Sequence, residues 1–203
     1  MDIEFKISKN PVNYKKALMF LEKRVELVKQ GGKELVWLLE HPLTYSAGIR
    51  SKKEEILDKS ITVIKTNRGG KITLHNPGQQ IVYFVLNLNK RKKDIRNLVR
   101  QIENIIIKFL SIYKVKSNSD EKNVGIWVRR NKKIEKIAAI GIKVRRWIAY
   151  HGCAININND LTKYEKIIPC GIKNKGVTNL VNIKKQNYEK FEKMIFFEFC
   201  LQK

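Results

Sequence analysis

The sequence predicts an α/β fold of the α+β kind, in which helices flank a mixed β-sheet. The 203 residues correspond to one full domain, and we expect a single domain over residues 1–203. Apolar stretches of strand length outnumber the stretches with helical spacing. Several of these strands follow one another closely enough to pair as hairpins, which favours a mixed sheet over a doubly wound parallel sheet.

Two long helices are predicted from apolar residues that recur every three or four positions. The first begins at the cap signal Asn10-Pro11 and ends at the glycine pair Gly31-Gly32. Its apolar face consists of Tyr14, Leu18, Leu21, Val25 and Val28. The apolar face of the second consists of Ile95, Leu98, Val99, Ile102, Ile106 and Phe109. A closing amphipathic helix is predicted from the spacing of Tyr188, Phe191, Ile195 and Phe199.

The predicted strands are short apolar runs bounded by glycine, proline or charged turns. They cover residues 35–39, 61–66, 81–86, 124–129, 136–144 and 147–150, with 154–157 as a further candidate. The run at 61–66 leads into a glycine pair, and the run at 81–86 follows an Asn-Pro-Gly turn. These connections place glycine-rich segments at the ends of strands.

The charge of the chain is strongly positive, with 42 Lys and Arg residues against 19 Asp and Glu residues and a net charge of +23. Such an excess is typical of nucleic-acid-binding proteins. Here the basic residues are spread along the chain, and no zinc-finger, basic-zipper or RNP pattern accompanies them. We therefore expect no nucleic-acid partner. The remaining interpretations are a solvated basic surface and a docking face for an acidic protein.

Membrane attachment and secretion are not expected from this sequence. No stretch reaches the roughly 18 consecutive apolar residues that span a bilayer, and the N-terminal segment lacks the apolar core of a secretion signal. The three cysteines lack the pairwise spacing of a disulfide framework. This cysteine usage indicates a reducing, cytoplasmic location.

Residues able to do chemistry gather beside glycine and proline at the predicted strand ends. His41 lies in EHP, His75 in LHNPGQ and His151 in YHG. A single histidine is more often structural, but the shared placement of all three favours a site. The RGG segment at 68–70 allows close backbone approach to a ligand and offers a guanidinium to an anion, with a plain turn as the alternative.

Cys170 is the candidate nucleophile, because it lies between Pro169 and Gly171 on a constrained loop. Cys153 enters an apolar strand, which favours a packing role, and Cys200 falls on the closing helix. A thiol has an ordinary pKa of about 8.5 and needs a nearby cation to be largely ionised at neutral pH. The spacing alone does not choose among the lysines and histidines that would supply it.

Several segments together resemble the lipoyl(octanoyl) transferases, the lipoate-protein ligase B family. They are EHPLTYSAGI at 40–49, RGGKITLHNPGQ at 68–79, KIAAIGIKVRRWIAYHGCAIN at 136–156 and PCG at 169–171, with VGIWV at 124–128 before the lysine motif. The resemblance runs in the family's order from about residue 14 to about residue 180. It departs from the family pattern at Asn76 in place of a glycine, Ala139 in place of a small polar residue, and Cys153 as a second thiol.

The resemblance implies the fold of the biotin/lipoate ligase catalytic domain and a transfer reaction without cofactor or metal. The implied donor is octanoyl-acyl carrier protein. The implied acceptors are a lysine on the lipoyl domains of 2-oxoacid dehydrogenases and one on the glycine cleavage H protein. We expect the chain to act as a monomer, and we expect basic residues such as Lys143, Arg145 and Arg146 to dock these acidic partners.

The resemblance also implies roles for particular residues. Cys170 would carry the octanoyl group as a thioester, while Lys136 would lower the pKa of that thiol and shuttle protons. The implied substrate-binding residues are Arg68, Gly69, Gly70, Lys71, Ile72, Thr73, Leu74, His75, Ala139, Ile140, Gly141, Gly152, Cys153 and Ala154. His41 and His151 are candidates for supporting roles. Two alternatives remain, an ATP-dependent lipoate ligase of the same fold and a basic, non-catalytic binding module.

Overall fold

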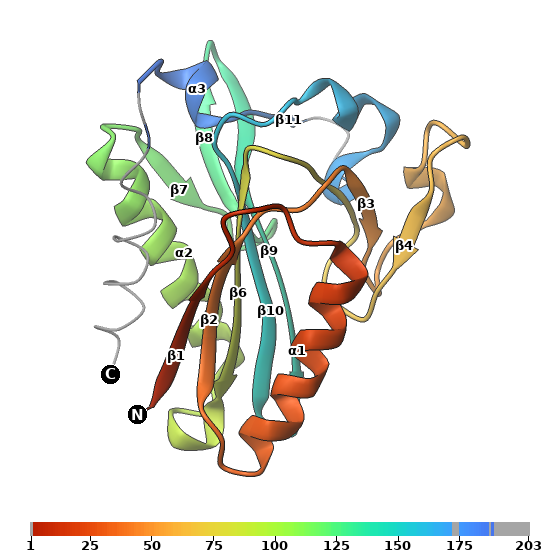
Figure 1. The fold of residues 1–203 in the computed structure, drawn as a ribbon. Helices are drawn as coiled ribbons and strands as arrows, with labels where there is room; N and C mark the ends of the chain where they lie inside the picture. The colour runs from red at the N-terminus through yellow and green to blue at the C-terminus, as the bar shows by residue number, and fades with distance from the viewer. Residues whose placement is uncertain (1, 172–174, 187, 189–203) are drawn as a thin grey trace.

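A mixed β-sheet of eight strands forms the centre of the fold (Figure 1), in the order β1-β2-β6-β10-β9-β8-β7 with β11 beside β9. The computed structural model describes residues 2–171, 175–186 and 188, except for the side chain of Cys170. The strands of this sheet are β1 (Ile3–Ile7), β2 (Glu34–Leu39), β6 (Gln79–Asn87), β7 (Ser117–Ser119), β8 (Ile126–Arg130), β9 (Lys133–Arg145), β10 (Ile148–Asn156) and β11 (Gly176–Val177). β1 pairs with β2 and β11 with β9 in parallel, while β10 pairs with both neighbours antiparallel. The predicted mixed sheet is confirmed.

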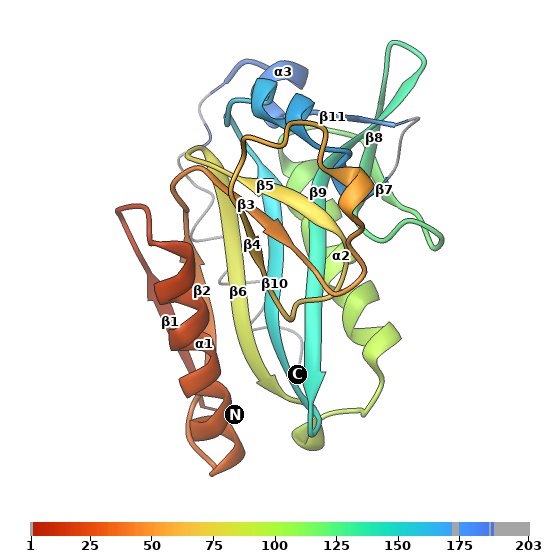
Figure 2. The ribbon, with the colours of Figure 1, turned by 90° about the vertical axis from the view of Figure 1, so that its right-hand side faces the viewer.

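A small second sheet and the helices cover the two faces of the large sheet. The small sheet, in the order β4-β3-β5, consists of β3 (Thr44–Ala47), β4 (Val63–Lys65) and β5 (Ile72–His75). The helices are α1 (Tyr14–Lys29), α2 (Ile95–Ile112) and α3 (Leu180–Ile183), with short 3-10 turns η1 (Lys53–Glu55), η2 (Leu88–Lys90), η3 (Thr162–Lys166) and η4 (Pro169–Gly171). Figure 2 shows α1 and the small sheet on one face of the large sheet, with α2 on the other.

Burial on both faces explains why the central strands are continuously apolar. On β2, Leu35, Trp37 and Leu39 belong to the core beneath α1, and Val36 and Leu38 belong to the core beneath α2. β6 repeats the alternation, with Ile81, Tyr83 and Val85 toward α1 and Val82, Phe84 and Leu86 toward α2. The two amphipathic helices therefore each close one core.

Three sequence predictions about the elements need correction. The first helix begins later than predicted, because the Asn13 side chain, not Asn10, accepts the capping hydrogen bond from Lys16 N. The predicted strand 61–66 is the three-residue β4 of the small sheet. The segments 147–150 and 154–157 belong to one strand, β10, which passes straight through the His151-Gly152 pair.

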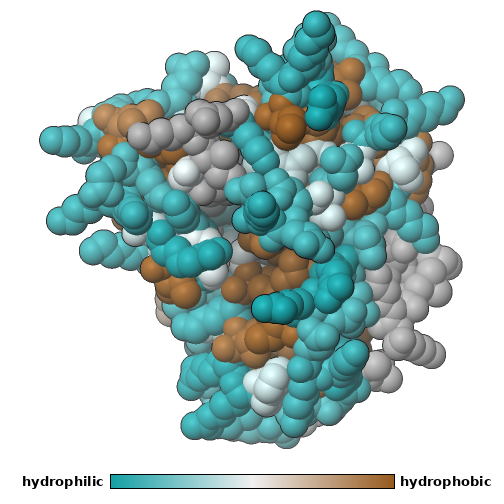
Figure 3. Space-filling view, turned by 180° about the vertical axis from the view of Figure 1, so that it is seen from behind, coloured by the Kyte–Doolittle hydropathy of each residue, from teal (hydrophilic) through white to brown (hydrophobic). Residues whose placement is uncertain are grey.

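Five short strands were not predicted from the sequence, and the structure does not test the predicted closing helix. β1, β3, β5, β7 and β11 were not predicted, because none of them is longer than five residues. The predicted closing helix falls mostly on residues outside the described part of the chain. Within the described residues, no helix is long and apolar enough to cross a membrane. Figure 3 shows a largely hydrophilic face with scattered apolar patches, as the spread of basic residues predicts.

Replacing Arg91 by methionine is expected to destabilise the fold by about 3–5 kcal/mol, because it leaves a buried carboxylate unpaired. Glu34 is 2% exposed and accepts two hydrogen bonds from the Arg91 guanidinium, at 2.5 and 2.6 Å. Urea unfolding at neutral pH measures the loss. Arg145→Met, which breaks exposed pairs with Glu22 and Glu26, is the control and should cost only about 1 kcal/mol. Equal losses in both variants would contradict this prediction.

Candidate active site

Two adjoining cavities lie between the small sheet and strands β9 and β10. The first is lined by Tyr14, Arg68, Gly70, Lys71, Thr73, His75, Ile81, Tyr83, Ala139, Ile140, Gly141, His151, Gly152, Cys153 and Ala154. The second is lined by Thr73, Gln79, Lys136, Ala139, Ala154, Asn156, Tyr164, Pro169 and Val177. Thr73, Ala139 and Ala154 line both, so the two cavities meet at these side chains.

Glycines bring the 68–70 segment into direct contact with the large sheet. The Gly69 amide donates to Ile142 O at 3.2 Å, and a Cβ on Gly69 would lie 2.7 Å from the same oxygen. Gly141 and Gly152 are cross-strand partners on β9 and β10, so neither places a side chain between the strands and this segment. The close approach that Gly69 permits is thus to the backbone of β9, while an approach of this segment to a ligand stays a prediction.

A buried chain of hydrogen bonds runs beneath the first cavity. The Arg68 guanidinium donates to Ser46 O at 2.7 Å and to Ser46 Oγ at 2.9 Å. Ser46 Oγ lies 3.1 Å from His75 Nε2, and His75 Nδ1 lies 2.8 Å from Gln79 Oε1. Because an amide oxygen only accepts, Nδ1 carries the proton and Nε2 accepts from the serine. Burial, followed by the charges of His41 and Arg68, holds the pKa of His75 well below its usual value, so the ring is neutral.

Gln79 extends this chain into the second cavity. Its amide nitrogen donates to Asn156 Oδ1 at 2.9 Å and to Tyr164 OH at 3.1 Å, and these contacts fix the orientation of the amide. Asn156 Nδ2 in turn donates to Thr178 O at 3.0 Å. This series of hydrogen bonds thus links the Arg68 loop to the segment that follows Cys170.

His151 presents an unpaired acceptor at the first cavity. Its Nε2 lies 2.8 Å from Asn67 Oδ1, and Asn67 Nδ2 donates to the Glu22 carboxylate at 2.8 Å. Since the carboxylate only accepts, Asn67 must face His151 with its oxygen, and His151 Nε2 must carry the proton. Nδ1 is then unprotonated, and this buried acceptor has no hydrogen-bond donor among the described residues. Burial, then Arg68 and Lys143, lowers the pKa of His151 to about 3.

The buried histidines are expected to make the protein acid-labile. Burial lowers the pKa of His41 to about 4, and the pKa values of His75 and His151 are also lowered, so the folded state binds fewer protons than the unfolded state below pH 6.5. Stability is therefore complete above pH 6.5 and is lost as pH falls toward the folded-state values, by about 2 kcal/mol at pH 5 for each of His41 and His151. Urea unfolding at pH 7.5 and 5.0 measures the fall. His151→Asn, which tolerates the positive φ of that residue, should reduce the fall by about 2 kcal/mol; an unreduced fall would contradict the assignment.

The turn that carries Cys170 is η4, and it is fixed at both ends. Ile168 N donates to Glu55 O at 2.8 Å, and Gly171 N donates to Ile168 O at 3.0 Å. Gly171 has φ +66°, and a Cβ there would lie 2.2 Å from Lys71 Nζ and 2.6 Å from Glu55 Oε1. Lys71 and Glu55 form an ion pair at 3.0 Å that lacks the angular geometry of a hydrogen bond. The glycine of the PCG motif is thus favoured by its backbone conformation, and a side chain there would displace the flexible ends of Lys71 and Glu55.

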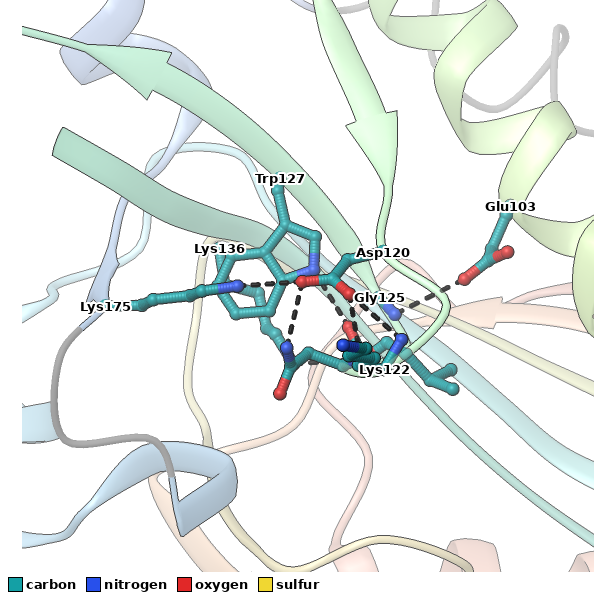
Figure 4. Close-up of polar contacts among 9 residues, drawn as sticks. Glu103, Asp120, Lys122, Gly125, Trp127, Lys136 and Lys175 are labelled. Carbon is teal, nitrogen blue, oxygen red and sulfur yellow. Dashed lines mark hydrogen bonds and ion pairs between the residues drawn. The ribbon is translucent and has the colours of Figure 1, made fainter. Parts of the chain in front are cut away.

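Lys136 lines the second cavity together with Pro169, and its side chain is almost fully buried. Its ammonium donates to Val124 O at 3.1 Å and lies 4.5 Å from the centre of the Trp127 ring (Figure 4). No ion pair among the described residues involves Lys136. A buried ammonium held by a carbonyl and an aromatic face alone is available to serve another anionic group.

Cys153 lies among apolar side chains and lines the first cavity. Burial raises the pKa of its thiol to about 12, so it is protonated at neutral pH and is a poor nucleophile. This agrees with the packing role that the sequence indicated. The competing thiol does not match the chemistry expected of Cys170.

Most of the residues expected at the substrate site line the two cavities. On β5, Thr73 and His75 face the first cavity, while Ile72 and Leu74 face the small core on the other side, as strand alternation requires. Gly69 packs on Ile142, and His41 lies behind the cavity, 2.9 Å from Tyr83 OH.

Sequence reasoning missed further lining residues: Tyr14, Ile81, Tyr83, Gln79, Asn156, Tyr164 and Val177. Tyr14 was placed on the apolar face of the first helix, a signal equally typical of packing. Among the basic residues expected to dock partners, Arg145 is held by Glu26 of α1 at 3.1 Å. The positive charge of Arg145 is therefore partly neutralised by an ion pair within this protein, which leaves less of it to attract an acidic partner.

Known proteins are similar to this chain over most of its length. Residues 13–200 match the family model "Lipoyl protein ligase A/B catalytic domain". A protein named octanoyltransferase from Anaplasma phagocytophilum is 44% identical over 98% of this chain and 98% of its own length. Another of that name from Ehrlichia chaffeensis is 45% identical over 94% of this chain and 91% of its own.

Solved structures share the fold at lower sequence identity. A lipoate-protein ligase A bound with ATP matches with a TM-score of 0.78 and 17% identity, over 98% of this chain and 84% of that one. At this identity the match concerns the fold alone, and it confirms the predicted ligase-type catalytic fold. The family model and the sequence relatives show that the chain belongs to the lipoyl protein ligase A/B catalytic domain family, among the octanoyltransferases.

Proposed function

We propose that this octanoyltransferase carries the octanoyl group on Cys170 between two partner proteins. The donor is octanoyl-acyl carrier protein, and the acceptor is a lysine of a lipoyl domain of a 2-oxoacid dehydrogenase or of the glycine cleavage H protein. The observation that carries the proposal is that Pro169, next to Cys170, lines the same cavity as Lys136, and that this cavity meets a second one. A nucleophile, a proton carrier and space for an acyl chain would then be adjacent.

The proposed reaction has two acyl transfers. In the first, the Cys170 thiolate attacks the donor thioester, a new C–S bond forms, the old one breaks, and the carrier leaves as a thiol after gaining a proton. In the second, the acceptor amine attacks the enzyme thioester, an amide forms, and Cys170 leaves as a thiolate. In the first transfer the Lys136 ammonium gives a proton to the departing carrier thiolate, and in the second the now neutral Lys136 amine takes the proton that the acceptor amine loses. The exchange between thioesters is nearly balanced, and amide formation draws the sequence forward.

The octanoyl chain is proposed to run along β9 and β10 from the second cavity into the first. Ala139 pairs with Ala154 across the strands, and Gly141 pairs with Gly152, so one face of this ribbon lacks large side chains. An alkyl chain placed there would contact apolar groups such as Ile81. Each CH₂ removed from water contributes about 0.8 kcal/mol, which favours a chain that fills the space.

The lowered histidine pKa values support Lys136 as the proton carrier. Burial lowers the pKa of His41 to about 4 and that of His151 to about 3. A base whose pKa lies so far below neutral pH takes up a proton poorly there. The histidines are therefore assigned to hydrogen bonding and packing.

An ATP-dependent lipoate ligase is the second candidate, favoured by the fold shared with the ATP-bound ligase. It would activate the free acid as an adenylate and would need no cysteine nucleophile. The two are distinguished by modifying a lipoyl domain with octanoyl-acyl carrier protein or with octanoate plus ATP, using the wild type and Cys170→Ala. We expect activity with the carrier protein only, abolished in Cys170→Ala. Activity with octanoate plus ATP that survives in Cys170→Ala would identify a ligase.

A further inference from the structure

The side chain of Lys136 rests in a cradle formed by residues 120–127. Val124 O accepts a hydrogen bond from its ammonium at 3.1 Å, and the Trp127 ring lies beneath it at 4.5 Å. Gly125 makes room for this amine, since a Cβ there would lie 3.2 Å from Lys136 Nζ and 2.7 Å from Ala138 O. Gly125 also has φ +132°, which L residues rarely adopt. The position of the Lys136 amine therefore depends on the shape of this turn.

Asp120 organises the cradle without touching Lys136 (Figure 4). Its Oδ1 accepts from Lys122 N at 2.9 Å and from Asn123 N at 3.2 Å, and its Oδ2 accepts from Asn123 Nδ2 at 2.9 Å. Asn123 O then accepts from Trp127 Nε1 at 2.9 Å. The carboxylate thus fixes the turn, and the turn fixes the indole beneath Lys136.

Lys175 connects the cradle to the segment that follows Cys170. Its ammonium lies 2.8 Å from Asp120 Oδ2 and 4.3 Å from the centre of the Trp127 ring. Two ammonium groups therefore share one indole, and a single carboxylate pairs with one of them. The hydrogen bond from Lys175 is the largest cause that holds the pKa of Asp120 well below its usual value, so this pair is ionised at neutral pH.

A second contact secures the same connection. Gly176 and Val177, which follow Lys175 directly, pair in parallel with Glu135 and Lys136 of β9. Thr178 N donates to Lys136 O at 3.0 Å. The backbone of Lys136 is thus held by the segment after Cys170, and its amine is held by a turn that Lys175 anchors.

We propose that Asp120 and Lys175 are a positioning pair, which holds the Lys136 amine in register with the turn that carries Cys170. This inference rests on the proposed roles of Cys170 and Lys136 in octanoyl transfer. Among the described residues, no hydrogen bond or ion pair joins either member of the pair to Lys136 Nζ. Breaking the pair removes the side-chain link between the turn and the post-Cys170 segment and leaves only the backbone pairing with β9, so that the Lys136 amine shifts while the acyl space is kept.

Asp120→Asn removes the charge pair and keeps the backbone contacts of the turn. Its amide oxygen can replace Oδ1 as acceptor for the two backbone amides, while its NH₂ group cannot accept from Lys175 or from Asn123 Nδ2. Lys175→Met removes the ammonium and keeps the stem, and Lys175→Arg restores a cation that can pair with Asp120. Lys33→Met, which breaks the exposed Lys33–Asp2 pair, is the matched control.

The readouts are the rate of Cys170 acylation by octanoyl-acyl carrier protein in a single turnover, its half-saturating donor concentration, and the pH profile of Cys170 alkylation by iodoacetamide. We expect Asp120→Asn and Lys175→Met each to slow acylation about tenfold, with the half-saturating concentration unchanged, since a small misplacement of a catalytic group has effects of this order. The alkylation profile should move to higher pH. The double variant should be no slower than either single variant, and Lys175→Arg should recover most of the rate.

Wild-type rates in both single variants would overturn the proposed pair. So would multiplicative losses in the double variant, or rate losses that also appear in Lys33→Met. Thermal unfolding of each variant shows whether a slow rate merely follows a lower Tm, which would also overturn it. A wild-type protein that forms no Cys170 adduct would refute the proposed function itself, and this outcome is visible before any variant is compared.

Discussion

Replacing Lys136 by methionine is expected to slow octanoyl transfer by about 10²- to 10⁴-fold, the range that general acid–base catalysis contributes. Methionine keeps the apolar stem in contact with Trp127 and removes the ammonium that donates to Val124 O. Without it, the amine proton has no carrier, and the cation next to the Cys170 turn is lost. A single-turnover assay with octanoyl-acyl carrier protein and a lipoyl domain measures the effect.

The same substitution is expected to leave the free energy of unfolding unchanged or to raise it. Lys136 buries an ammonium without a carboxylate partner among the described residues, and removing such a charge is often neutral or stabilising. Lys133→Met, on the exposed start of the same strand, is the control and should keep the wild-type rate. A Lys136→Met protein that transfers at the wild-type rate, or that loses activity only by unfolding, would contradict the assigned role.

Replacing Gly152 by alanine is expected to destabilise the fold by about 3 kcal/mol or more, because inserted atoms in a close-packed site displace the backbone. A Cβ at this position would lie 1.8 Å from Val82 O and 2.9 Å from Val82 C. Both atoms belong to β6, which would have to separate from β10 at the centre of the sheet. Urea unfolding measures the loss of stability.

Gly176→Ala is the comparison for this prediction. A Cβ at Gly176 would meet only the flexible Glu135 side chain, at 3.2 Å, so the cost should stay near the ordinary effect of a surface substitution, about 0.5 kcal/mol. Similar losses in the two variants would show that contact with Val82 does not set the requirement for glycine. The expected difference assigns Gly152 a role in the fold in addition to any role at the substrate site.

The sequence predicted the large elements well, for a physical reason. Helices α1 and α2 each bury one face, and β2 and β6 bury both, so their residues carry strong periodic or continuous apolar patterns. The strand β10 was predicted as two pieces, because a His-Gly pair is typical of a break. β10 continues through Gly152, which packs closely against Val82 of β6. This contact joins residues about 70 positions apart, so the sequence around Gly152 does not reveal it.

The candidate site was predictable where its residues stand in specific motifs. Cys170, Lys136 and the segment around Arg68 were identified in this way. The function of individual side chains was not, because it depends on partners far along the chain. The sequence left open whether the Arg68 guanidinium serves an anion or belongs to a plain turn, and it did not indicate the hydrogen bonds that Arg68 donates to Ser46 on β3. The pair of Asp120 and Lys175 joins two loops of ordinary composition, which no sequence pattern marks.

The most direct measurement of the central claim is intact-protein mass spectrometry after mixing with octanoyl-acyl carrier protein. We predict one octanoyl adduct that hydroxylamine removes and that peptide mapping assigns to Cys170. Cys170→Ala should lose the adduct, and Cys153→Ala should retain it, since burial raises the pKa of the Cys153 thiol to about 12. Addition of a lipoyl domain should discharge the adduct and modify one lysine of that domain. No adduct, or an adduct confined to Cys153, would contradict the account.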